Sequence, residues 1–575
     1  MSTSSSLSVW IAHAQAQLDA ATRALALRCA SGARIDGAKA DAWQVPSYEL
    51  AWAAAHLLAA RTLDDWLARA DAAAAPSGQA GDAGDAGNTG NGGAMAQGLA
   101  RLFIVEALVD VIARLEAMQM DLGLDGAALR AWTADAGWLR LRQQCAGQDA
   151  QRALGAAVAA GDADFGAPPL SQDVRMAFES FARFADEQVA PLAERIHRED
   201  LTIPESLLQP LREMGVFGLS VPQRFGGIGP DDHDDTPLMV AVTEALSEGS
   251  LGAAGSLITR PEILSRALLA GGTDEQKTHW LPRLAAGDPL CAIAMTEPDH
   301  GSDVASLQLR ATRTDAGWVL DGAKTWCTFA GKAGVLMVVA RTEADRALGH
   351  KGLSLLLVEK PSTEDHAFEV TQPGGGRLSG RAIPTIGYRG MHSYDLSFQN
   401  FLVPHSHLVG GDAGRGKGFY LTMQGMMGGR MQTAARACGV MRAALRAACR
   451  YARDRKVFGE PLAQFALTQS KLSRMAARWM ACRHAAYAVA QLMDAGGGRM
   501  EASLVKLLAC RSAEIVTREA LQLHGGMGYA EETAVSRYFV DARVLSIFEG
   551  AEETLALKVV ARSLLEGALA GASTA

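Results

Sequence analysis

The sequence predicts a mainly helical protein with a β domain at its centre. Through most of the first 290 residues, apolar side chains recur at three- and four-residue steps, the spacing of one buried helix face. Between residues 291 and 412 the pattern changes to short apolar runs separated by turn residues, as in a small barrel or sandwich. Helical spacing then returns. A chain of 575 residues is too long for one hydrophobic core, so we expect several structural units.

Residues 1–165 are expected to form a helical unit. Apolar residues repeat at helical spacing in the stretches 10–25, 48–70 and 99–122. Between the last two stretches, residues 76–93 are rich in Gly, Ala, Asp and Asn. They have little to bury and are predicted to form a flexible loop. No residue pattern in this unit indicates chemistry, so we expect a structural or interface role.

Two further helical segments are expected, a domain at residues 171–290 and a C-terminal bundle at residues 413–575. In the first of these, Thr273 and Gln276 have the spacing of a capping box. Such a pair begins a helix by satisfying two backbone amides that lack helical partners.

The β domain is expected at residues 291–412. Gly317–Gly322 is predicted to be the corner of a hairpin with a strand on each side. Further strands are predicted at Val335–Arg341, Leu353–Glu359 and Leu396–Val403.

Composition and charge exclude several classes of protein. Hydrophobic residues make up 49% and charged residues 21%, which is ordinary for a globular protein and unlike a disordered one. The net charge of -8 gives no reason to expect nucleic acid as a partner. The eight cysteines form neither a disulfide pattern nor a zinc-binding cluster, so buried thiols and no metal are expected. No apolar run is long enough for a membrane span and the first residues do not resemble a signal peptide, so a cytoplasmic protein is expected.

Four motifs in the second half of the chain carry a resemblance to one enzyme family. They are, in chain order, Met295-Thr296-Glu297-Pro298-Asp299-His300-Gly301-Ser302-Asp303, Asp321-Gly322-Ala323-Lys324-Thr325-Trp326-Cys327-Thr328, the segment Tyr451–Gly459, and the segment that runs from Gln522-Leu523-His524-Gly525-Gly526 to Ile547-Phe548-Glu549-Gly550. In this order and spacing they resemble the signatures of the acyl-CoA dehydrogenase family. The resemblance covers about residues 171–566, and the first 165 residues lie outside it.

The resemblance implies an FAD cofactor. An isoalloxazine ring needs backbone amides and hydroxyls near its polar edge and an apolar face for stacking. By resemblance, Met295, Thr296 and Ser302 lie beside the flavin and substrate, while Trp326 and Thr328 flank the reactive flavin nitrogen. The residues expected to reach the FAD of a neighbouring subunit are Arg455, Phe458, Gln522, Gly525 and Gly526. A cofactor shared in this way implies a homo-oligomer. The alternatives are core packing for Trp326 and a solvated helix charge for Arg455.

Glu549 is the candidate catalytic base. Removal of an α-proton from a thioester requires a carboxylate in a pocket that excludes water. The family carries this base in an Ile-Tyr-Glu-Gly sequence, and Ile547-Phe548-Glu549-Gly550 is similar to it. Some branched-chain members place the base just before the Arg that matches Arg430, but here that residue is Gly429, which has no side chain. By resemblance, the residues expected to contact substrate are Ser302, Arg430, Phe548 and Gly550. An ordinary surface Glu is the alternative for Glu549.

A finer resemblance concerns the acyl group. The long N-terminal helical unit and the segments Gly387–Tyr394 and Phe548–Thr554 are similar to those of family members that oxidise (2S)-methylsuccinyl-CoA to mesaconyl-CoA in the ethylmalonyl-CoA pathway. This substrate carries a free carboxylate, so a buried cation or several donors should face the acyl tail. Arg260 is the candidate for that cation. A pair with Glu262, or a place at a helix end, is the alternative.

The implied reaction is an α,β-dehydrogenation. Glu549 takes the α-proton while a hydride leaves the β-carbon for the flavin, and an electron-transfer flavoprotein is the expected electron acceptor. A dehydrogenase of another short or branched acyl-CoA is the nearest alternative. A flavin-containing nucleic-acid-binding protein is a more distant alternative. Arginines at helical spacing in one C-terminal helix favour it, but the acidic charge of the chain as a whole counts against it. The apolar helix faces of residues 1–165 lead us to expect a dimer rather than a tetramer.

Overall fold

The computed structural model describes residues 3–74, 91–161 and 165–572. The chain divides into two compact units, residues 1–171 together with 440–575 and residues 172–439, and each is described by itself. Most of the predicted flexible loop, residues 76–90 of the tract 76–93, lies outside the described residues, and a helix begins at Asn91.

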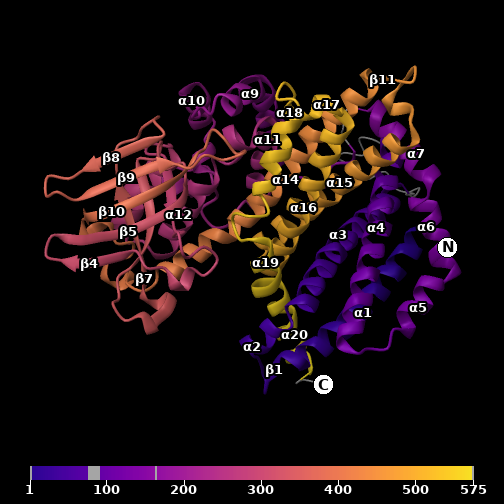
Figure 1. The fold of residues 1–575 in the computed structure, drawn as a ribbon, viewed down its shortest axis with the longest axis horizontal. Coiled ribbons are helices and arrows are strands. Elements are labelled where there is room, and N and C mark those ends of the chain that lie inside the picture. Colours follow the sequence, from indigo (N-terminus) through magenta and orange to yellow (C-terminus); the bar gives the residue numbers. More distant parts are fainter. Residues whose placement is uncertain (1–2, 75–90, 162–164, 573–575) are drawn as a thin grey trace. The chain divides into compact units, whose positions relative to one another are not determined.

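The first unit combines helices from both ends of the chain (Figure 1). Its N-terminal elements are α1 (Thr3–Cys29), β1 (Ala30–Ser31), β2 (Arg34–Ile35), α2 (Gly37–Ala42), α3 (Gln44–Ala74), α4 (Asn91–Leu122), α5 (Ala127–Ala134), α6 (Ala136–Ala146) and α7 (Gln148–Ala160). Its C-terminal elements are the end of α14 (Gly418–Asp454), β11 (Lys456–Val457), β12 (Glu460–Pro461), α15 (Ala466–Asp494), α16 (Arg499–His524), α17 (Gly526–Tyr529), α18 (Ala534–Val544), α19 (Glu552–Thr554), the π-helical turn η10 (Leu555–Ala561) and α20 (Arg562–Ala572).

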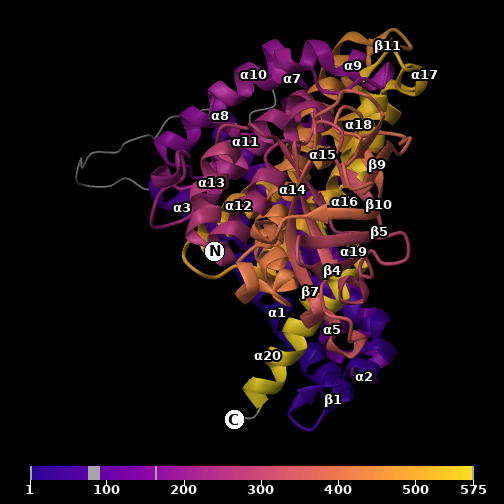
Figure 2. The ribbon, with the colours of Figure 1, turned by 90° about the vertical axis from the view of Figure 1, so that its left-hand side faces the viewer.

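These two sets of helices share one core. Helices α3, α4 and α7 pack against α15, while α3 also packs against α16 and α1 against α20. Figure 2 shows α20 beside the β1–β2 hairpin, which it also contacts. The approach is close at Gly155, where a β-carbon would lie 1.8 Å from the carbonyl oxygen of Gln469. The predicted N-terminal helical extension is therefore confirmed, and its apolar faces are buried against the C-terminal helices.

The second unit begins with helices that precede a sheet. They are α8 (Gln172–Phe184), α9 (Ala190–Arg198), α10 (Glu205–Glu213), α11 (Thr236–Gly249), α12 (Thr259–Gly271) and α13 (Asp274–Ala285), and the first part of α14 closes the unit. The predicted capping box at the start of α13 is confirmed, since the backbone of Gln276 donates to the Thr273 hydroxyl and the backbone of Thr273 donates to the Gln276 side chain. The Gln276 amide also donates to the carbonyls of Ser406 and Leu408, which ties this helix to the end of the β domain.

The sheet has eight strands in the order β3-β6-β4-β5-β10-β9-β8, with β7 paired to β6 on its other edge. The strands are β3 (Cys291–Ala294), β4 (Arg310–Thr314), β5 (Gly317–Thr328), β6 (Val335–Arg341), β7 (Leu353–Glu359), β8 (Ala367–Thr371), β9 (Arg377–Ala382) and β10 (Ser393–Val403). Strands β6 and β7 are apolar apart from Ser354 and their last residues, Arg341 and Glu359, and both of their faces are buried. One face packs on α12 and α13 and the other lines the interior of the sheet.

The predicted strands at 335–341, 353–359 and 396–403 are confirmed, but the hairpin corner predicted at Gly317–Gly322 is wrong. These residues belong to the long strand β5, and the turn lies before them, between Thr314 and Gly317. Gly322 has φ 137°, so it bends the strand without ending it. The mainly helical fold with a central sheet is confirmed. Among the residues that the structure describes, none of the helices combines the length and apolar character that a bilayer span requires.

Candidate active site

A buried ion pair joins the first two motifs. Lys324 on β5 donates to the Glu297 carboxylate and to the Met295 carbonyl, at 2.8 Å in each case. The Lys324 side chain has no exposed surface, and burial lowers its pKa to about 8 although Glu297 opposes the shift. Glu297 also accepts from the backbone amides of Gln308 and Leu309, at 2.7 and 2.8 Å. The pair therefore fixes the loop that carries Met295 and Thr296 against β5.

Trp326 lies on a bulge of β5. Tyr394 pairs with Cys327 and Leu396 with Lys324, so one residue of β10 faces both Thr325 and Trp326. The extra residue gives Trp326 a φ of 55° and turns its side chain outward, where it is 55% exposed. Core packing, the alternative reading of this tryptophan, is thus wrong for this chain. An exposed indole face is what stacking on an aromatic ring requires.

Polar groups surround this bulge. The hydroxyls of Thr328 and Ser393 lie 2.9 Å apart, and the Thr325 amide donates to the Thr296 carbonyl at 2.9 Å. Met295, Thr296, Trp326 and Thr328 therefore occupy one region of the second unit. Ser302 lies farther along the same loop and is exposed.

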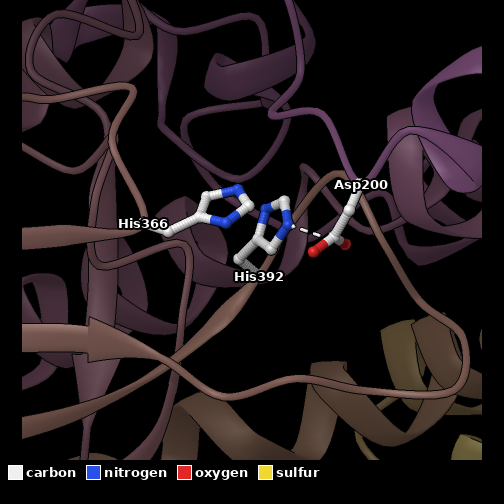
Figure 3. Close-up of side chains that lie close together, drawn as sticks. All are labelled: Asp200, His366 and His392. Atoms are coloured by element: carbon white, nitrogen blue, oxygen red, sulfur yellow. Dashed lines mark hydrogen bonds and ion pairs between the residues drawn. The ribbon is translucent and has the colours of Figure 1, made fainter.

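Three side chains that could ligate a metal lie close together: Asp200 after α9, His366 before β8 and His392 before β10. Figure 3 shows His392 between His366 and Asp200, and their ligand atoms all lie within 4.8 Å of one another. His392 Nε2 is 3.2 Å from Asp200 Oδ1, and Arg389 Nε lies 3.4 Å from the same oxygen. Burial lowers the pKa of His392, which Asp200 opposes. Because the carboxylate already has these two partners, we interpret the group as an anchor for the turn before Ser393. That the chain holds no metal stays a prediction.

Arg260 is buried in the first turn of α12. Its guanidinium donates to the Tyr388 hydroxyl at 3.0 Å and to the Ser256 carbonyl. Pairing with Glu262, one of the two alternatives considered for this arginine, is wrong, since Glu262 accepts from Arg266 at 2.8 Å and from Gln432. The other alternative, a place at a helix end, is confirmed, because Arg260 is the second residue of α12. Over the described part of the chain, no carboxylate forms an ion pair with Arg260, although only 5% of the residue is exposed.

Arg430 is half-buried on α14, which runs close to α12. A β-carbon at Gly428 would lie 2.0 Å from Glu262 Oε1, and one at Gly425 would lie 2.7 Å from the Ile263 carbonyl. The glycines ahead of Arg430 thus let two helices of the second unit approach each other. Arg436, one and a half turns farther along α14, donates to the Thr259 hydroxyl beside Arg260.

The third motif forms a hairpin in the first unit. Strands β11 and β12 pair across Phe458 and Gly459, which have φ of 50° and 89°. Two consecutive left-handed residues form the tight turn that the twist of a hairpin favours. Phe458 is 97% exposed at its tip, and Arg455 is exposed just before β11. Both side chains are accessible for a group outside the unit.

A ring stack joins the third motif to the fourth. The rings of Tyr451 and His524 lie 4.2 Å apart and nearly parallel, and burial lowers the pKa of His524. The chain leaves α16 at Gly525, with φ of 57°, and Gln522 is exposed one turn earlier. A β-carbon at Gly525 or Gly526 would meet nothing within 4 Å. This turn is an open cradle of backbone, which suits a phosphate group approaching from outside.

Glu549 follows α18 on a strained loop. Its φ is 53° and that of Gly550 is 99°, so two consecutive residues are left-handed. Glu549 Oε2 is buried and makes no hydrogen bond within the described residues. Phe548 and Gly550 beside it are half-buried. A desolvated carboxylate oxygen without a donor is suited to accept a proton.

Comparison with known proteins identifies the family to which the chain belongs. Family models for the N-terminal, middle and C-terminal domains of acyl-CoA dehydrogenases match residues 171–288, 292–401 and 416–565. The chain belongs to the acyl-CoA dehydrogenase family, as its motifs predicted.

Individual relatives agree with this assignment. A (2S)-methylsuccinyl-CoA dehydrogenase of Cereibacter sphaeroides is 44% identical over 71% of this chain and 72% of its own length. The butyryl-CoA dehydrogenase structure from Megasphaera elsdenii matches with a TM-score of 0.62 at 28% identity, over 69% of this chain and 99% of that one. A glutaryl-CoA dehydrogenase of Mycobacterium smegmatis in complex with FADH2 gives a TM-score of 0.61 at 27% identity, over 69% and 95% of the two chains.

Several residues that shape the site were missed from the sequence. Glu297 and Lys324 were quoted only as parts of motifs, although a lysine within a mostly apolar strand is a signal of a buried ion pair. Tyr388 lies in the segment Gly387–Tyr394 that carries the finer resemblance, but its contact with Arg260 has no local signal because 128 residues separate them. Lys506, which donates to the Gly550 carbonyl at 2.7 Å, has no local signal among the several charged residues of α16.

Proposed function

We propose that this chain catalyses the FAD-dependent α,β-dehydrogenation of a short branched acyl-CoA, (2S)-methylsuccinyl-CoA, to mesaconyl-CoA. The observation that carries the choice of substrate is the buried Arg260 guanidinium, which has no carboxylate partner among the described residues. The relative from Cereibacter sphaeroides, which is named for this substrate, supports the same choice. A dehydrogenase of another short or branched acyl-CoA is the alternative.

The residues present fit an FAD cofactor. Trp326 offers an exposed ring, Thr328 and the Thr296 loop offer polar groups beside it, and the Gly525–Gly526 turn offers an open backbone cradle. Arg455, Phe458 and Gln522 are exposed, as residues that serve the cofactor of a second subunit must be. When bound, FAD supplies the acceptor for the hydride that leaves the β-carbon.

Glu549 acts as the base in this proposal. Its Oε2 atom has no hydrogen-bond donor to satisfy it among the described residues, so the carboxylate gains by taking the α-proton. The strained loop fixes the direction of the carboxylate before substrate arrives, which reduces the entropic part of the barrier. Loss of the α-proton and the β-hydride together gives the trans-enoyl thioester.

Arg260 binds the free carboxylate of the substrate. An isolated buried cation is costly, and an incoming carboxylate offsets that cost through charge-assisted hydrogen bonds. The residue stands in the first turn of α12, where backbone amides and the helix dipole also favour an anion. The Tyr388 hydroxyl orients the guanidinium from the side. A monocarboxylic thioester would leave this cation unpaired.

An electron-transfer flavoprotein is the proposed acceptor of electrons from the reduced enzyme. We propose a homodimer, because the N-terminal helices cover faces of α15 and α16 that would otherwise be open to another subunit. Light scattering of the intact protein tests this directly, and a tetramer would contradict it. The proposed reaction involves neither nucleic acid nor a membrane.

An anaerobic titration of the purified flavoprotein tests the proposal. Flavin absorbance is followed during addition of (2S)-methylsuccinyl-CoA and, separately, of butyryl-CoA and isobutyryl-CoA. We expect bleaching by (2S)-methylsuccinyl-CoA alone, and we expect the Glu549→Gln variant to bind the thioester and stay oxidised. Bleaching by the monocarboxylic thioesters only would refute the substrate, and a fully active Glu549→Gln variant would refute the base.

A further inference from the structure

The loop that carries Glu549 is held at both ends within the first unit. The left-handed backbone at Glu549 and Gly550 is a conformation that persists only when its surroundings impose it. Lys506 donates to the Gly550 carbonyl at 2.7 Å, and the Glu552 amide donates to the Ser546 carbonyl at 3.1 Å. These two bonds close a tight loop with Glu549 at its centre.

The side chain of Glu552 attaches this loop to two helices, α16 and α3. The residue is only 5% exposed, and a buried carboxyl group requires hydrogen-bond partners. One donor is Arg511 on α16, with Nη2 2.5 Å from Oε1. The other is the hydroxyl of Tyr48, which bonds to the same oxygen. Tyr48 lies on α3, in the N-terminal extension and 504 residues away along the chain.

The extension supports both donors. Trp52 lies one helical turn after Tyr48, and the Arg511 guanidinium lies over its ring at 5.5 Å from the centroid. The Tyr48 and Trp52 rings are 6.3 Å apart. Helix α3 thus presents a hydroxyl to the Glu552 carboxylate and an aromatic face to the arginine that completes the carboxylate's hydrogen bonds. The resemblance to the family begins only at residue 171, so α3 lies outside it.

We infer that Tyr48 is a positioning residue for Glu549. Tyr48 acts on the loop of Glu549 through Glu552 and Arg511. This inference rests on the proposed role of Glu549 as the base. Glu552 lies three residues after Glu549, and the intervening chain is the closed loop itself. A shift of the Glu552 carboxylate therefore moves the Glu549 carboxylate, and a displacement of about 1 Å at a reacting group costs up to roughly 100-fold in rate. The N-terminal extension accordingly takes part in orienting the catalytic loop.

The test is the Tyr48→Phe variant, which removes one hydroxyl and keeps the ring. In stopped-flow bleaching by (2S)-methylsuccinyl-CoA, we expect the rate at saturating substrate to fall roughly tenfold or more. The substrate concentration at half-maximal rate and the FAD content should stay within about twofold, since neither depends on the direction of Glu549. The Arg511→Lys variant keeps the charge but loses the guanidinium fork, so it should change the same rate in the same direction.

Tyr420→Phe is the matched control. Its hydroxyl also forms one hydrogen bond, to His350 at 2.9 Å, and Tyr420 belongs to the other unit and is not one of the residues assigned to the site. We expect no change in its bleaching rate. If Tyr48→Phe lowers the thermal midpoint or the FAD content but leaves the rate per bound FAD unchanged, Tyr48 is merely structural and the inference is wrong. If none of the three thioesters bleaches the wild-type enzyme, the proposed function fails and the inference falls with it.

Discussion

The Glu297–Lys324 pair gives the sharpest prediction about the site's framework. Replacement of Lys324 by Met leaves the buried Glu297 carboxylate with two backbone amides and no cation. Removal of one partner of a buried pair costs about 3 to 5 kcal/mol. Because both amides remain, we expect a value near the lower limit, about 3 kcal/mol, which corresponds to roughly 150-fold in an opening equilibrium. The loop with Met295 and Thr296 should open accordingly.

Native-state hydrogen exchange measures this opening at the amides of Gln308 and Leu309, which donate to Glu297. We expect exchange about 150-fold faster in Lys324→Met, since the two bonds break when the loop opens. A double-mutant cycle with Glu297→Gln should show strong coupling, because the double variant contains neither buried charge. Lys277→Met is the control, since its ion pair with Asp274 is long, at 3.9 Å, and Asp274 is exposed. Additive effects in the cycle, or exchange equal to that of the control, would refute the reasoning.

Two further predictions concern the substrate and pH. Arg260→Met should lower kcat/KM for (2S)-methylsuccinyl-CoA at least about 30-fold, from roughly 2 kcal/mol for a truncated charge pair, and leave the FAD content unchanged. Arg266→Met, on the same helix but paired with Glu262, should leave kcat/KM within a few-fold of wild type, and an unchanged kcat/KM in Arg260→Met would exclude Arg260 as the residue that binds the free carboxylate. Burial lowers the pKa of His484 to about 3 against an ordinary value of 6.5, so stability is full above pH 6.5 and is lost as pH falls towards 3, by about 1.4 kcal/mol per unit. Urea unfolding of the protein at pH 7 and 5 should show this loss, and His484→Gln should reduce the difference; an equal difference in the variant would assign the loss to other groups.

Periodicity predicted the helical stretches 10–25, 48–70 and 99–122 and three of the eight strands of the central sheet, because helix faces and sheet faces are each defined by residues close in sequence. Strands β6 and β7 were recognised within their true bounds, since both faces are buried and every residue is constrained. The error at Gly317–Gly322 has a different origin. Gly317 and Gly322 favour a turn in the sequence, but the register with β4 places the turn before Gly317. Gly322, with its positive φ, lies within the strand as a bend.

Candidate site residues can be named from the sequence where a motif is local, but not where contacts are assembled from distant segments. The candidate base Glu549, Trp326 and the Gly525–Gly526 turn each lie in one short segment, so the resemblance names them, and their roles stay predictions. The partners that fix them come from far away in the sequence: Tyr388 for Arg260, and Tyr48 for the loop of Glu549. Their contacts depend on which helix of the fold lies beside which loop, and a single sequence carries no local signature of that.

Three of the candidate site residues have a left-handed backbone conformation. Trp326, Phe458 and Glu549 all have positive φ, which costs a residue with a side chain of order 1 to 3 kcal/mol. At each position glycine would satisfy the backbone without that cost, and glycine does follow immediately at 459 and 550. A bulky or charged side chain at such a position therefore has a role of its own, since the backbone conformation alone would favour glycine. For Phe458 and Trp326 that contribution is not packing within their own unit, because both are largely exposed. The three residues that the motifs assigned to flavin and proton chemistry are thus among the eight non-glycine residues with positive φ in the described parts of the chain.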